Sequence, residues 1–411
     1  MKRNLLKQMR NEWRDNLWLI IELLVVFVAI WGLGMVLYAK TKGLFIPMGI
    51  EKDNVYSLTT KTISKDNPNF VAVDSLKLGY MEDLRQIVRA LSQNPNVEAV
   101  GIESSLVPYN YNYNGQNLDF VDGKDSISYM GNVRYSSPEM IKVMGIKSLT
   151  GASAEQLTAM LEREEILISN NPYYEKSGGD PKKLIGRKVY LEGDSTKMYR
   201  IGDVVQQIRR TEYEAGWAGG IIIPIGNKQK YWGDVALKVK PGRDSQFKED
   251  FKNNPELRKH RNVYLSDLKS LDSIRVLCQR NDEVTVRTFV ALMFFLLITI
   301  FLGLLGTFWF RMQQRVSEIA IRKVCGASRN EIFRRILSEG MILLICATIV
   351  VSAFIWPFIE KFENIVNEEW YVFLIGEVIT FAIVAVGIIV SVWYPARKAM
   401  NIEPAEAVKT E

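Results

Sequence analysis

The chain has 411 residues, of which 48% are hydrophobic, and it carries a formal net charge of +6. Its apolar residues are concentrated in four long blocks, which argues against a series of ordinary soluble domains. The positive charge is explained by short basic segments beside these blocks, so it gives no reason to expect a nucleic-acid partner.

The first predicted element covers residues 1–15. Its apolar residues, which fall on one helical face, are Leu5, Leu6, Met9 and Trp13. Basic residues lie around this face. This pattern is typical of a helix that lies on the cytoplasmic side in contact with membrane lipid headgroups. A basic flank without fixed structure explains the same residues equally well, so both alternatives stay open.

Four blocks reach the roughly 20 residues that a helix needs to cross hydrocarbon. They are residues 16–39, 288–310, 340–358 and 370–394. Buried helices of soluble domains are usually shorter and have a polar stripe, which these blocks lack. The first block is too long for a signal peptide and no cleavage site follows it, so we expect an uncleaved anchor. The sequence therefore predicts four transmembrane helices.

Lysine and arginine in the short flanks predict the orientation of these helices. The amino-terminal flank and residues 311–339 are rich in both, so we place them in the cytoplasm. The acidic loop at residues 359–369 suits the outer face. The tail at residues 395–411 is then cytoplasmic as well, and residues 40–287 form an exported domain.

The exported domain is predicted to be mixed α/β. Helical spacing at residues 81–94 is followed by a strand pattern within residues 95–104. Later, residues 235–240, 243–254 and 262–265 give the order strand, helix, strand. Only Cys278 of the three cysteines lies in this domain, so no disulfide can form within it. With about 250 residues, the domain is large enough to be held by its own core.

An inserted lobe is predicted over about residues 105–218, which leaves a core of about residues 40–104 and 219–287. The lobe contains two hairpin dipeptides, Asn114-Gly115 and Asp122-Gly123, and a strand pair within residues 185–205. A buried strand at residues 219–225 starts the returning core segment. The alternating Tyr109, Tyr111 and Tyr113 fit either a surface for a partner or a half-buried strand, and both alternatives stay open.

Few residues support catalysis or metal binding. The single histidine, His260, lies in a charged stretch, so we expect a surface residue and no triad or histidine-based metal site. Two carboxylates lie inside predicted spans, Glu22 near the cytoplasmic end of the first and Glu377 near the outer end of the fourth. Their different depths exclude a pair. Ion coupling is one interpretation, but we favour bonds to neighbouring helices or contact with the interface.

The segment RVSEIAIRKVCGASRNEIFRRIL, residues 315–337, lies between the second and third spans. Glu318 and Arg322 are spaced for an ion pair on a helix. Gly326 can end a helix in the left-handed conformation, and Ser328 with Glu331 forms a capping box that starts another. We predict a helix continuing from the second span, a sharp bend, and a helix running into the third span. Such a segment can act as a lever, because a partner that pushes it moves the spans.

This segment resembles the signature of the MacB/FtsX-like permeases of ABC transporters. The matching residues are Glu318, Ile319, Ile321, Arg322, Gly326 and Ala327. The exported strand pair within residues 185–205 is similar to one in the periplasmic domains of that family. The ending YPARKAMNIEPAEAV resembles the carboxyl terminus of the family. The resemblance therefore covers the whole chain.

The resemblance implies an α-helical protein of the bacterial inner membrane, with four transmembrane helices, a mixed α/β periplasmic domain between helices 1 and 2, and both termini in the cytoplasm. Two copies, or two related permeases, form a dimer. The residues that couple to an ABC ATPase are Glu318, Ile319, Ile321, Arg322, Gly326, Ala327, Ser328 and Glu331. In MacB-type pumps, ATP-driven motion pushes periplasmic substrate toward an outer-membrane channel with the help of an adaptor.

The sequence contains no G-x-x-x-x-G-K-[ST] motif. We therefore expect ATP to be bound by a separate subunit, and this chain to have no enzymatic activity, cofactor or metal of its own. Export of a periplasmic substrate is the leading expectation. The alternatives are a lipoprotein-releasing permease and an FtsX-like signalling subunit that controls a cell-wall hydrolase, although the large exported domain argues against the last.

Overall fold

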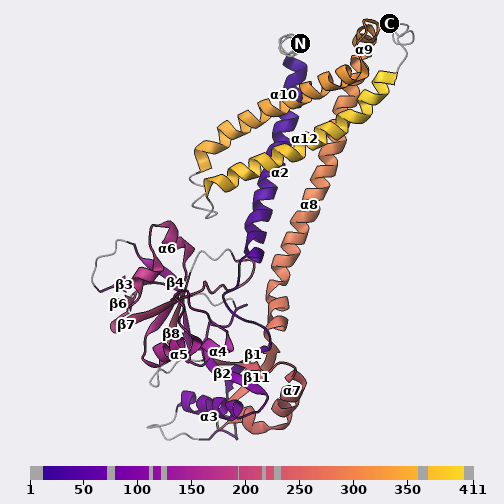
Figure 1. Cartoon of the computed structure of the whole chain (residues 1–411). Helices are drawn as coiled ribbons and strands as arrows, with labels where there is room; N and C mark the ends of the chain where they lie inside the picture. Colours follow the sequence, from indigo (N-terminus) through magenta and orange to yellow (C-terminus); the bar gives the residue numbers. More distant parts are fainter. Residues whose placement is uncertain are drawn as a thin grey trace. The chain divides into compact units, whose positions relative to one another are not determined.

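The computed structural model describes residues 13–71, 79–110, 114–121, 127–192, 194–214, 219–225, 233–359 and 369–401. The chain divides into two compact units, which are described separately (Figure 1). The membrane unit comprises residues 1–40 and 284–411, and the α/β unit comprises residues 41–283. Most of the predicted element at residues 1–15, most of the predicted loop at 359–369 and the last ten residues lie outside the described part.

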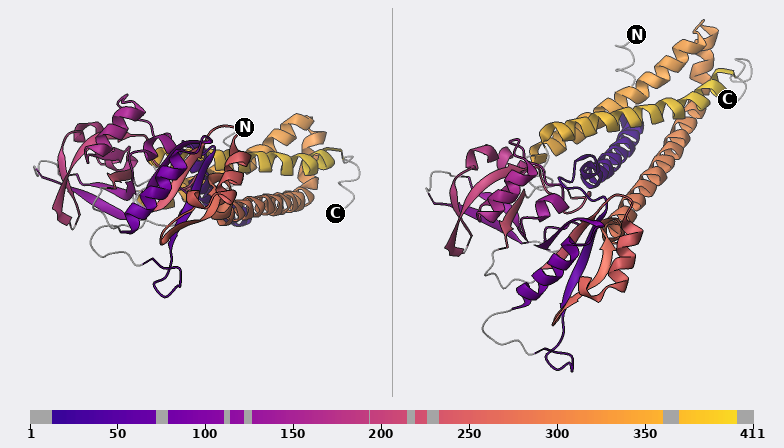
Figure 2. Two further views of the ribbon diagram at one scale, coloured as in Figure 1. Left: turned by 90° about the horizontal axis from the view of Figure 1, so that it is seen from below. Right: turned by 60° about the horizontal axis from the view of Figure 1, so that its bottom comes forward.

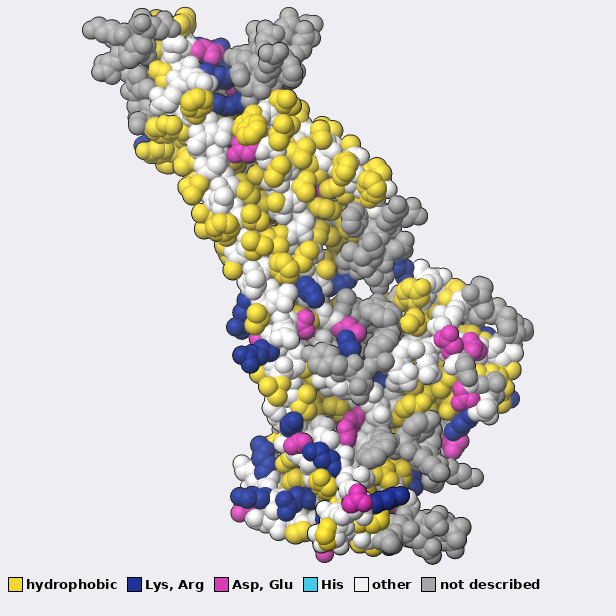
Figure 3. Space-filling view, turned by 180° about the vertical axis from the view of Figure 1, so that it is seen from behind, with side chains coloured by type: hydrophobic (Ala, Val, Ile, Leu, Met, Phe, Trp, Pro, Cys, Tyr) yellow, Lys and Arg dark blue, Asp and Glu magenta, His cyan; other side chains and the backbone are white. Residues whose placement is uncertain are grey.

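Four helices, each long and apolar enough to cross a membrane, are present at the four predicted blocks. They are α2 (Trp13–Thr41), α8 (Leu271–Gln314), α10 (Arg329–Ile355, followed by the 3-10 turn η4, Trp356–Phe358) and α12 (Trp370–Asn401). Hydrophobic side chains gather over the outside of the membrane unit (Figure 3). An apolar surface of this extent is typical of helices surrounded by lipid.

The helices of the membrane unit pack around one apolar core. Helices α10 and α12 run side by side (Figure 2). The core is made of fully buried side chains from all four helices, including Leu19, Phe27, Leu304, Leu344 and Ile388. Nearly all of the described residues of this unit are in helices, which pair their own backbone groups, as a segment without access to water requires.

The core of the α/β unit is an antiparallel sheet in the order β10-β11-β1-β9-β2. Its strands are β1 (Val55–Thr62), β2 (Val97–Ser104), β9 (Asp234–Val239), β10 (Lys259–His260) and β11 (Val263–Ser270). Helices α3 (Tyr80–Ser92) and α7 (Asp244–Asn253) cover one face (Figure 1), with Leu84, Ile87 and Phe247 packed against the strands. The strands and helices predicted within residues 81–104 and 235–265 are confirmed.

The inserted lobe is a closed six-stranded barrel. Its strands are β3 (Gly115–Phe120), β4 (Tyr129–Ser136), β5 (Ile166–Ser169), β6 (Lys188–Leu191), β7 (Asp194–Val205) and β8 (Gly219–Pro224). The order β4-β3-β6-β7-β5-β8 returns on itself, because β8 also pairs with β4. Isoleucine, valine and tyrosine side chains fill the interior, among them Tyr129, Val133 and Ile221.

One predicted boundary is corrected by this topology. We expected the strand at residues 219–225 to belong to the returning core, but β8 pairs with β4 and β5 of the barrel. The lobe therefore extends past residue 218 to the end of β8. The barrel joins the core sheet through a short pairing of β2 with β4, Glu103 with Ser136 and Ser104 with Tyr135.

Two short helices, α4 (Met140–Val143) and α5 (Ala154–Glu162), close a third core of the α/β unit. Helix α6 (Pro172–Lys176) and the 3-10 turn η2 (Pro181–Leu184) add Tyr174 and Leu184 to the barrel core, and the turn η3 (Pro255–Leu257) adds Leu257 to the core of the sheet. A further turn, η1 (Lys42–Phe45), follows α2. Helices α4 and α5 contribute Met140, Leu157 and Leu161 to the third core, which also buries Leu271 at the start of α8. Helix α8 therefore begins well before the predicted span at residue 288, because its first turn packs in the α/β unit.

Candidate functional site

The segment between the second and third spans contains a separate short helix, α9 (Val316–Val324). We predicted that the helix of the second span would continue into it. Instead α8 ends at Gln314, and Arg315 leaves the helical conformation with ψ at 15°. The backbone N–H of Arg315 is shared between the carbonyls of Arg311 and Met312, both at 3.2 Å. The prediction of one uninterrupted helix at this point is wrong.

The predicted bend between α9 and α10 is present. Gly326 has φ +91°, and an added Cβ would meet no atom within 4 Å. The N–H groups of Gly326 and Ala327 donate to the carbonyls of Lys323 and Arg322, at 3.1 and 3.0 Å, and so end α9. Ser328 and Glu331 form the capping box of α10, each side chain accepting a backbone N–H of the other residue. These terminal features are local, which is why the sequence predicted them.

Helix α9 has a buried and an exposed face. Ile319 and Ala320 are only 7% and 6% exposed and pack in the membrane unit. Ile321 and Val324 are 59% and 70% exposed and lie three residues apart, so they share a face. Arg322 donates to Glu318 at 2.7 Å, as predicted from their spacing. We call Ile321, Arg322, Val324 and the exposed Cys325 the α9 surface.

A charged contact attaches the start of α9 to α10. The guanidinium of Arg315 donates to Glu339 at 2.6 Å, and Arg335 lies 3.8 Å from the same carboxylate. Glu339 is 24 residues further along the chain from Arg315, so no local spacing rule could have paired them. Because this contact spans the bend at Gly326, α9 is fixed to α10 at both of its ends. A force on the α9 surface would therefore act on α10.

The two carboxylates inside the spans bond to neighbouring helices. The hydroxyl of Thr307 in α8 donates to Glu22 at 3.2 Å, beside Gly303, which has no side chain to fill this space. The hydroxyl of Ser352 in α10 donates to Glu377 at 3.1 Å, and Glu377 is only 6% exposed. These contacts favour the structural interpretation of both residues over ion coupling.

The other residues considered in the sequence analysis are His260 and the tyrosines of the inserted lobe. His260 lies in β10, where its Nε2 is 3.9 Å from Asp83. Tyr109 is buried with φ +64° and donates its hydroxyl to Glu212, so it is neither exposed nor part of a strand. Tyr111 and Tyr113 lie outside the described residues. Within the described ranges, no group of three or more histidine, cysteine or acidic residues is placed to hold a metal.

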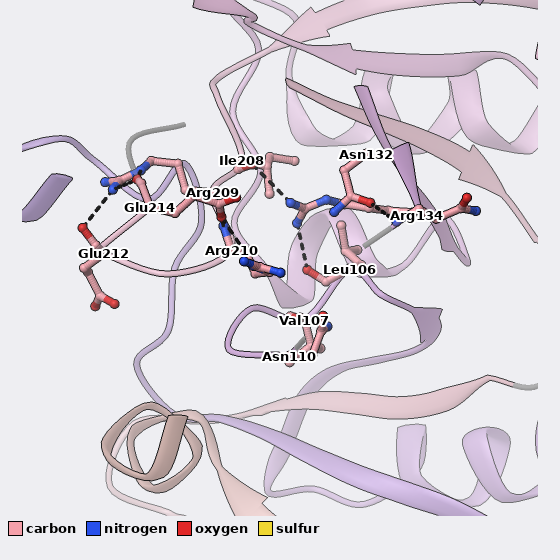
Figure 4. A network of polar contacts seen from close by, with 11 residues as sticks. Leu106, Val107, Asn110, Asn132, Arg134, Ile208, Arg209, Arg210, Glu212 and Glu214 are labelled. Atoms are coloured by element: carbon pink, nitrogen blue, oxygen red, sulfur yellow. Dashed lines mark hydrogen bonds and ion pairs between the residues drawn. The ribbon is translucent and has the colours of Figure 1, made fainter. Parts of the chain in front are cut away.

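A buried charged network in the α/β unit was not predicted; Figure 4 shows Arg134 of this network with its acceptors on Leu106 and Ile208. Glu103 accepts the backbone N–H groups of Leu106 at 2.8 Å and Val107 at 3.2 Å. Burial raises the pKa of Glu103 to about 7. Arg134 donates to the carbonyls of Ile208 at 3.2 Å and Leu106 at 3.4 Å, and burial lowers its pKa to about 10. The sequence did not predict this network, because Arg134 donates to backbone carbonyls 28 and 74 residues away along the chain.

A family model matches most of the carboxy-terminal part of the membrane unit. Residues 290–404 match the model of the family FtsX-like permease C-terminal. The chain is 24% identical over 184 residues to a protein of Pseudomonas fluorescens named as an export ATP-binding/permease protein. It is 29% identical over 189 residues to a protein of Pseudomonas syringae named as a syringafactin export ATP-binding/permease protein. Each match covers 44% of this chain and only 28% of the relative.

Two solved structures have a limited similarity to the chain. The periplasmic region of MacB from Actinobacillus actinomycetemcomitans aligns over 58% of this chain and 98% of its own, at 13% identity and a TM-score of 0.34. The extracellular domain of the transporter YknZ from Gram-positive bacteria aligns over 52% of this chain and 100% of its own, at 9% identity and a TM-score of 0.32.

Proposed function

Residues 290–404 are an FtsX-like permease region, and from this premise we propose that the chain is the permease subunit of an ABC transporter of the bacterial inner membrane. In this proposal the α9 surface docks on an ABC ATPase outside these 411 residues, which we expect to be a separate polypeptide. The chain itself binds no ATP. It works as a dimer, with a second copy or with a related permease.

The observation that carries this proposal is the two-sided character of α9. A nine-residue helix in water normally buries its apolar side chains, and Ile319 does so. Ile321 and Val324 point away from the membrane unit although they lie in the basic segment that we place in the cytoplasm. Exposed apolar residues beside charged ones are typical of a site where a protein partner binds.

The proposed mechanism uses the two long helices that flank α9. ATP binding by the partner displaces α9, and the Arg315–Glu339 contact passes this displacement to α10. Helix α8 is one continuous helix from Leu271 to Gln314, so it can carry the displacement into the α/β unit. The two curated relatives are named as export proteins. These names support export as the function. We further propose that the substrate is periplasmic and that an adaptor and an outer-membrane channel are partners, as the resemblance to MacB-type pumps implies.

Introducing charge into the α9 surface tests the docking. We expect the double variant Ile321→Glu, Val324→Glu to reach the membrane in normal amounts. The amount of ATPase that copurifies with it should be at least about tenfold lower than with the wild-type chain. Exclusion of two apolar side chains from a contact, about 1.5–3 kcal/mol each, is more than enough for this loss. The measurement is quantitative mass spectrometry of proteins captured with the tagged full-length chain from native membranes.

The matched control places the same two charges on the barrel. Val121→Glu combined with Met198→Glu changes two exposed apolar residues of the α/β unit, so it should retain the ATPase. If the α9 variant captured as much ATPase as the control variant, α9 would not be the docking site.

A further inference from the structure

The nine residues that follow β7, residues 206–214, contact several distant parts of the α/β unit. We call them the clasp loop. On the barrel side, the carbonyl of Ile208 accepts from the buried guanidinium of Arg134 in β4 (Figure 4). The backbone N–H of Gln206 also donates to the carbonyl of Lys147 at 2.9 Å. The clasp loop is therefore anchored in the barrel, from which it extends.

Arg209 joins the clasp loop to the segment that follows α2. Its side chain is 1% exposed, and its Nη1 donates to the carbonyls of Gly43 at 2.7 Å and Ile46 at 2.6 Å. The other guanidinium nitrogens donate within the clasp loop, to the carbonyls of Glu212 and Glu214. All of these acceptors are backbone oxygens in fixed positions. A planar guanidinium can reach them together, whereas the single ammonium group of lysine cannot.

Gly43 permits this contact from the other side. A Cβ at residue 43 would lie 2.3 Å from the carbonyl oxygen of Glu212 and 2.5 Å from Nη2 of Arg209. Real Cβ atoms do not approach a backbone oxygen so closely, so any larger residue would force the two segments apart. The sequence on both sides of the contact is thus adapted to it.

Glu212 joins the clasp loop to the first turns of α8. Its carboxylate lies 2.9 Å from Nε of Arg275 and accepts from the amide of Gln279. These two residues are four apart and share one face of α8. The same carboxylate accepts from Tyr109 at 2.9 Å and from Lys52 at 3.3 Å. Burial opposes the charge, but the bonds from Tyr109 and Gln279 and the charge of Arg275 hold the pKa of Glu212 below its ordinary value.

We propose that the clasp loop is the joint that positions the barrel on two stems. The amino-terminal stem is residues 43–46, held by Arg209, and the carboxy-terminal stem is residues 271–279, held by Glu212. Each charged side chain fixes one stem. The role of this joint in transport rests on the proposed function, since a permease that transmits motion through its stems needs the barrel to follow them. The joint itself is a property of the α/β unit alone.

The joint can be tested without any ATPase, by distances measured within the full-length chain in lipid nanodiscs. In a background without the three native cysteines, spin labels are attached to Met198→Cys on the barrel and to either Leu44→Cys or Leu277→Cys on the stems, all at exposed positions. Double electron–electron resonance then gives one barrel-to-stem distance distribution for each pair. We expect both distributions to be narrow in the otherwise wild-type chain.

The two charged residues should then act separately. Arg209→Lys keeps the positive charge but removes the planar guanidinium group. It is expected to broaden the barrel-to-Leu44 distribution at least about twofold and to leave the barrel-to-Leu277 distribution narrow. Glu212→Gln is nearly identical in shape, but it loses the ion pair with Arg275. It is expected to broaden the barrel-to-Leu277 distribution and to leave the barrel-to-Leu44 distribution narrow. Glu165→Gln makes the same acid-to-amide change at a barrel ion pair and should alter neither distribution.

Three results would overturn the proposal. Narrow distributions in both variants would show that the clasp contacts do not hold the stems. Broadening of both distances by the nearly isosteric Glu212→Gln would show that the two contacts do not act separately. Broadening by Glu165→Gln would show that the barrel responds to any lost charge. Because Glu212→Gln is nearly isosteric, it should keep the fold even if Arg209→Lys does not, and its selective effect on the Leu277 distance remains decisive. None of these outcomes depends on whether α9 binds an ATPase.

Discussion

Replacing Gly326 with valine is expected to leave the chain in the membrane but to lower the ATPase activity of the purified complex by about five- to thirtyfold. Gly326 has φ +91° between α9 and α10. An L-residue in the left-handed region costs about 1–2 kcal/mol, and a β-branched side chain is among the least suited to it. Relief of this strain requires the backbone to rotate at the bend, which would turn the α9 surface away from the ATPase.

The effect of this substitution should arise from the backbone alone. A Cβ at residue 326 meets no atom within 4 Å, so the site itself is open and the positive φ is the main obstacle to valine. A strain of 1–2 kcal/mol lowers the population of the original bend by the same factor that we expect in activity, about five- to thirtyfold. The measurement is ATP hydrolysis by the complex of the tagged chain with its copurified ATPase, normalised to the amount of permease.

A glycine in α8 offers the matched control. A Cβ at residue 306 would also meet no atom within 4 Å, but Gly306 does not have a positive φ. Gly306→Val should therefore retain normal ATPase activity. Replacing Glu318 and Arg322 together should also lower activity, because it removes their ion pair and the charged part of the α9 surface. Normal binding and turnover in the Gly326→Val complex would contradict the role of the bend.

Replacing Glu103 with glutamine is expected to remove a pH dependence from the stability of the α/β unit. Burial raises the pKa of Glu103 to about 7, and the nearby Asp234 adds to this, while the N–H groups of Leu106 and Val107 and the charge of Arg134 oppose it. The folded state thus holds the proton more tightly than the unfolded state. The stabilisation is fully present below about pH 4.5 and is lost as the pH rises through about 7, a total of about 3 kcal/mol.

Hydrogen exchange of the β2 segment measures this effect. Between about pH 5.5 and pH 8, the free energy of opening in the wild-type chain should fall by about 2 kcal/mol more than in Glu103→Gln, after correction for the intrinsic exchange rate. Glu162→Gln alters an exposed glutamate of α5 and should behave like the wild-type chain. Equal pH dependence in Glu103→Gln and the wild-type chain would show that Glu103 does not hold a proton in the folded state.

The features that the sequence predicted are those that depend on neighbouring residues. The four long apolar helices were predicted from continuous apolar blocks, and the structure has a helix at each of them. Gly326, Ser328 and Glu331 form the predicted bend because a helix terminus and a capping box need only three or four adjacent residues. The core helix α3 followed the 3.6-residue period of its apolar side chains.

The features that were missed depend on partners far away along the chain. Arg315 ends α8 beside a carboxylate, Glu339, that lies beyond the bend. Strand β8 was assigned to the wrong part of the domain because its parallel pairing with β4 joins segments more than 80 residues apart. Arg209 and Glu212 look like ordinary surface charges in the sequence, since their acceptors and donors are in residues 43–46 and α8. No local pattern encodes such contacts.

The central claim is that α9 lies in the cytoplasm in contact with an ATPase, and the exposed Cys325 allows a direct test. In native membranes, with Cys278 and Cys346 replaced, a short thiol-reactive cross-linker is attached to Cys325 and its products are identified by mass spectrometry. The account predicts a cross-link to an ABC ATPase, and no reaction of Cys325 with an impermeant thiol reagent added outside intact cells. Labelling of Cys325 from outside, or cross-linked products that contain no ATPase, would contradict it.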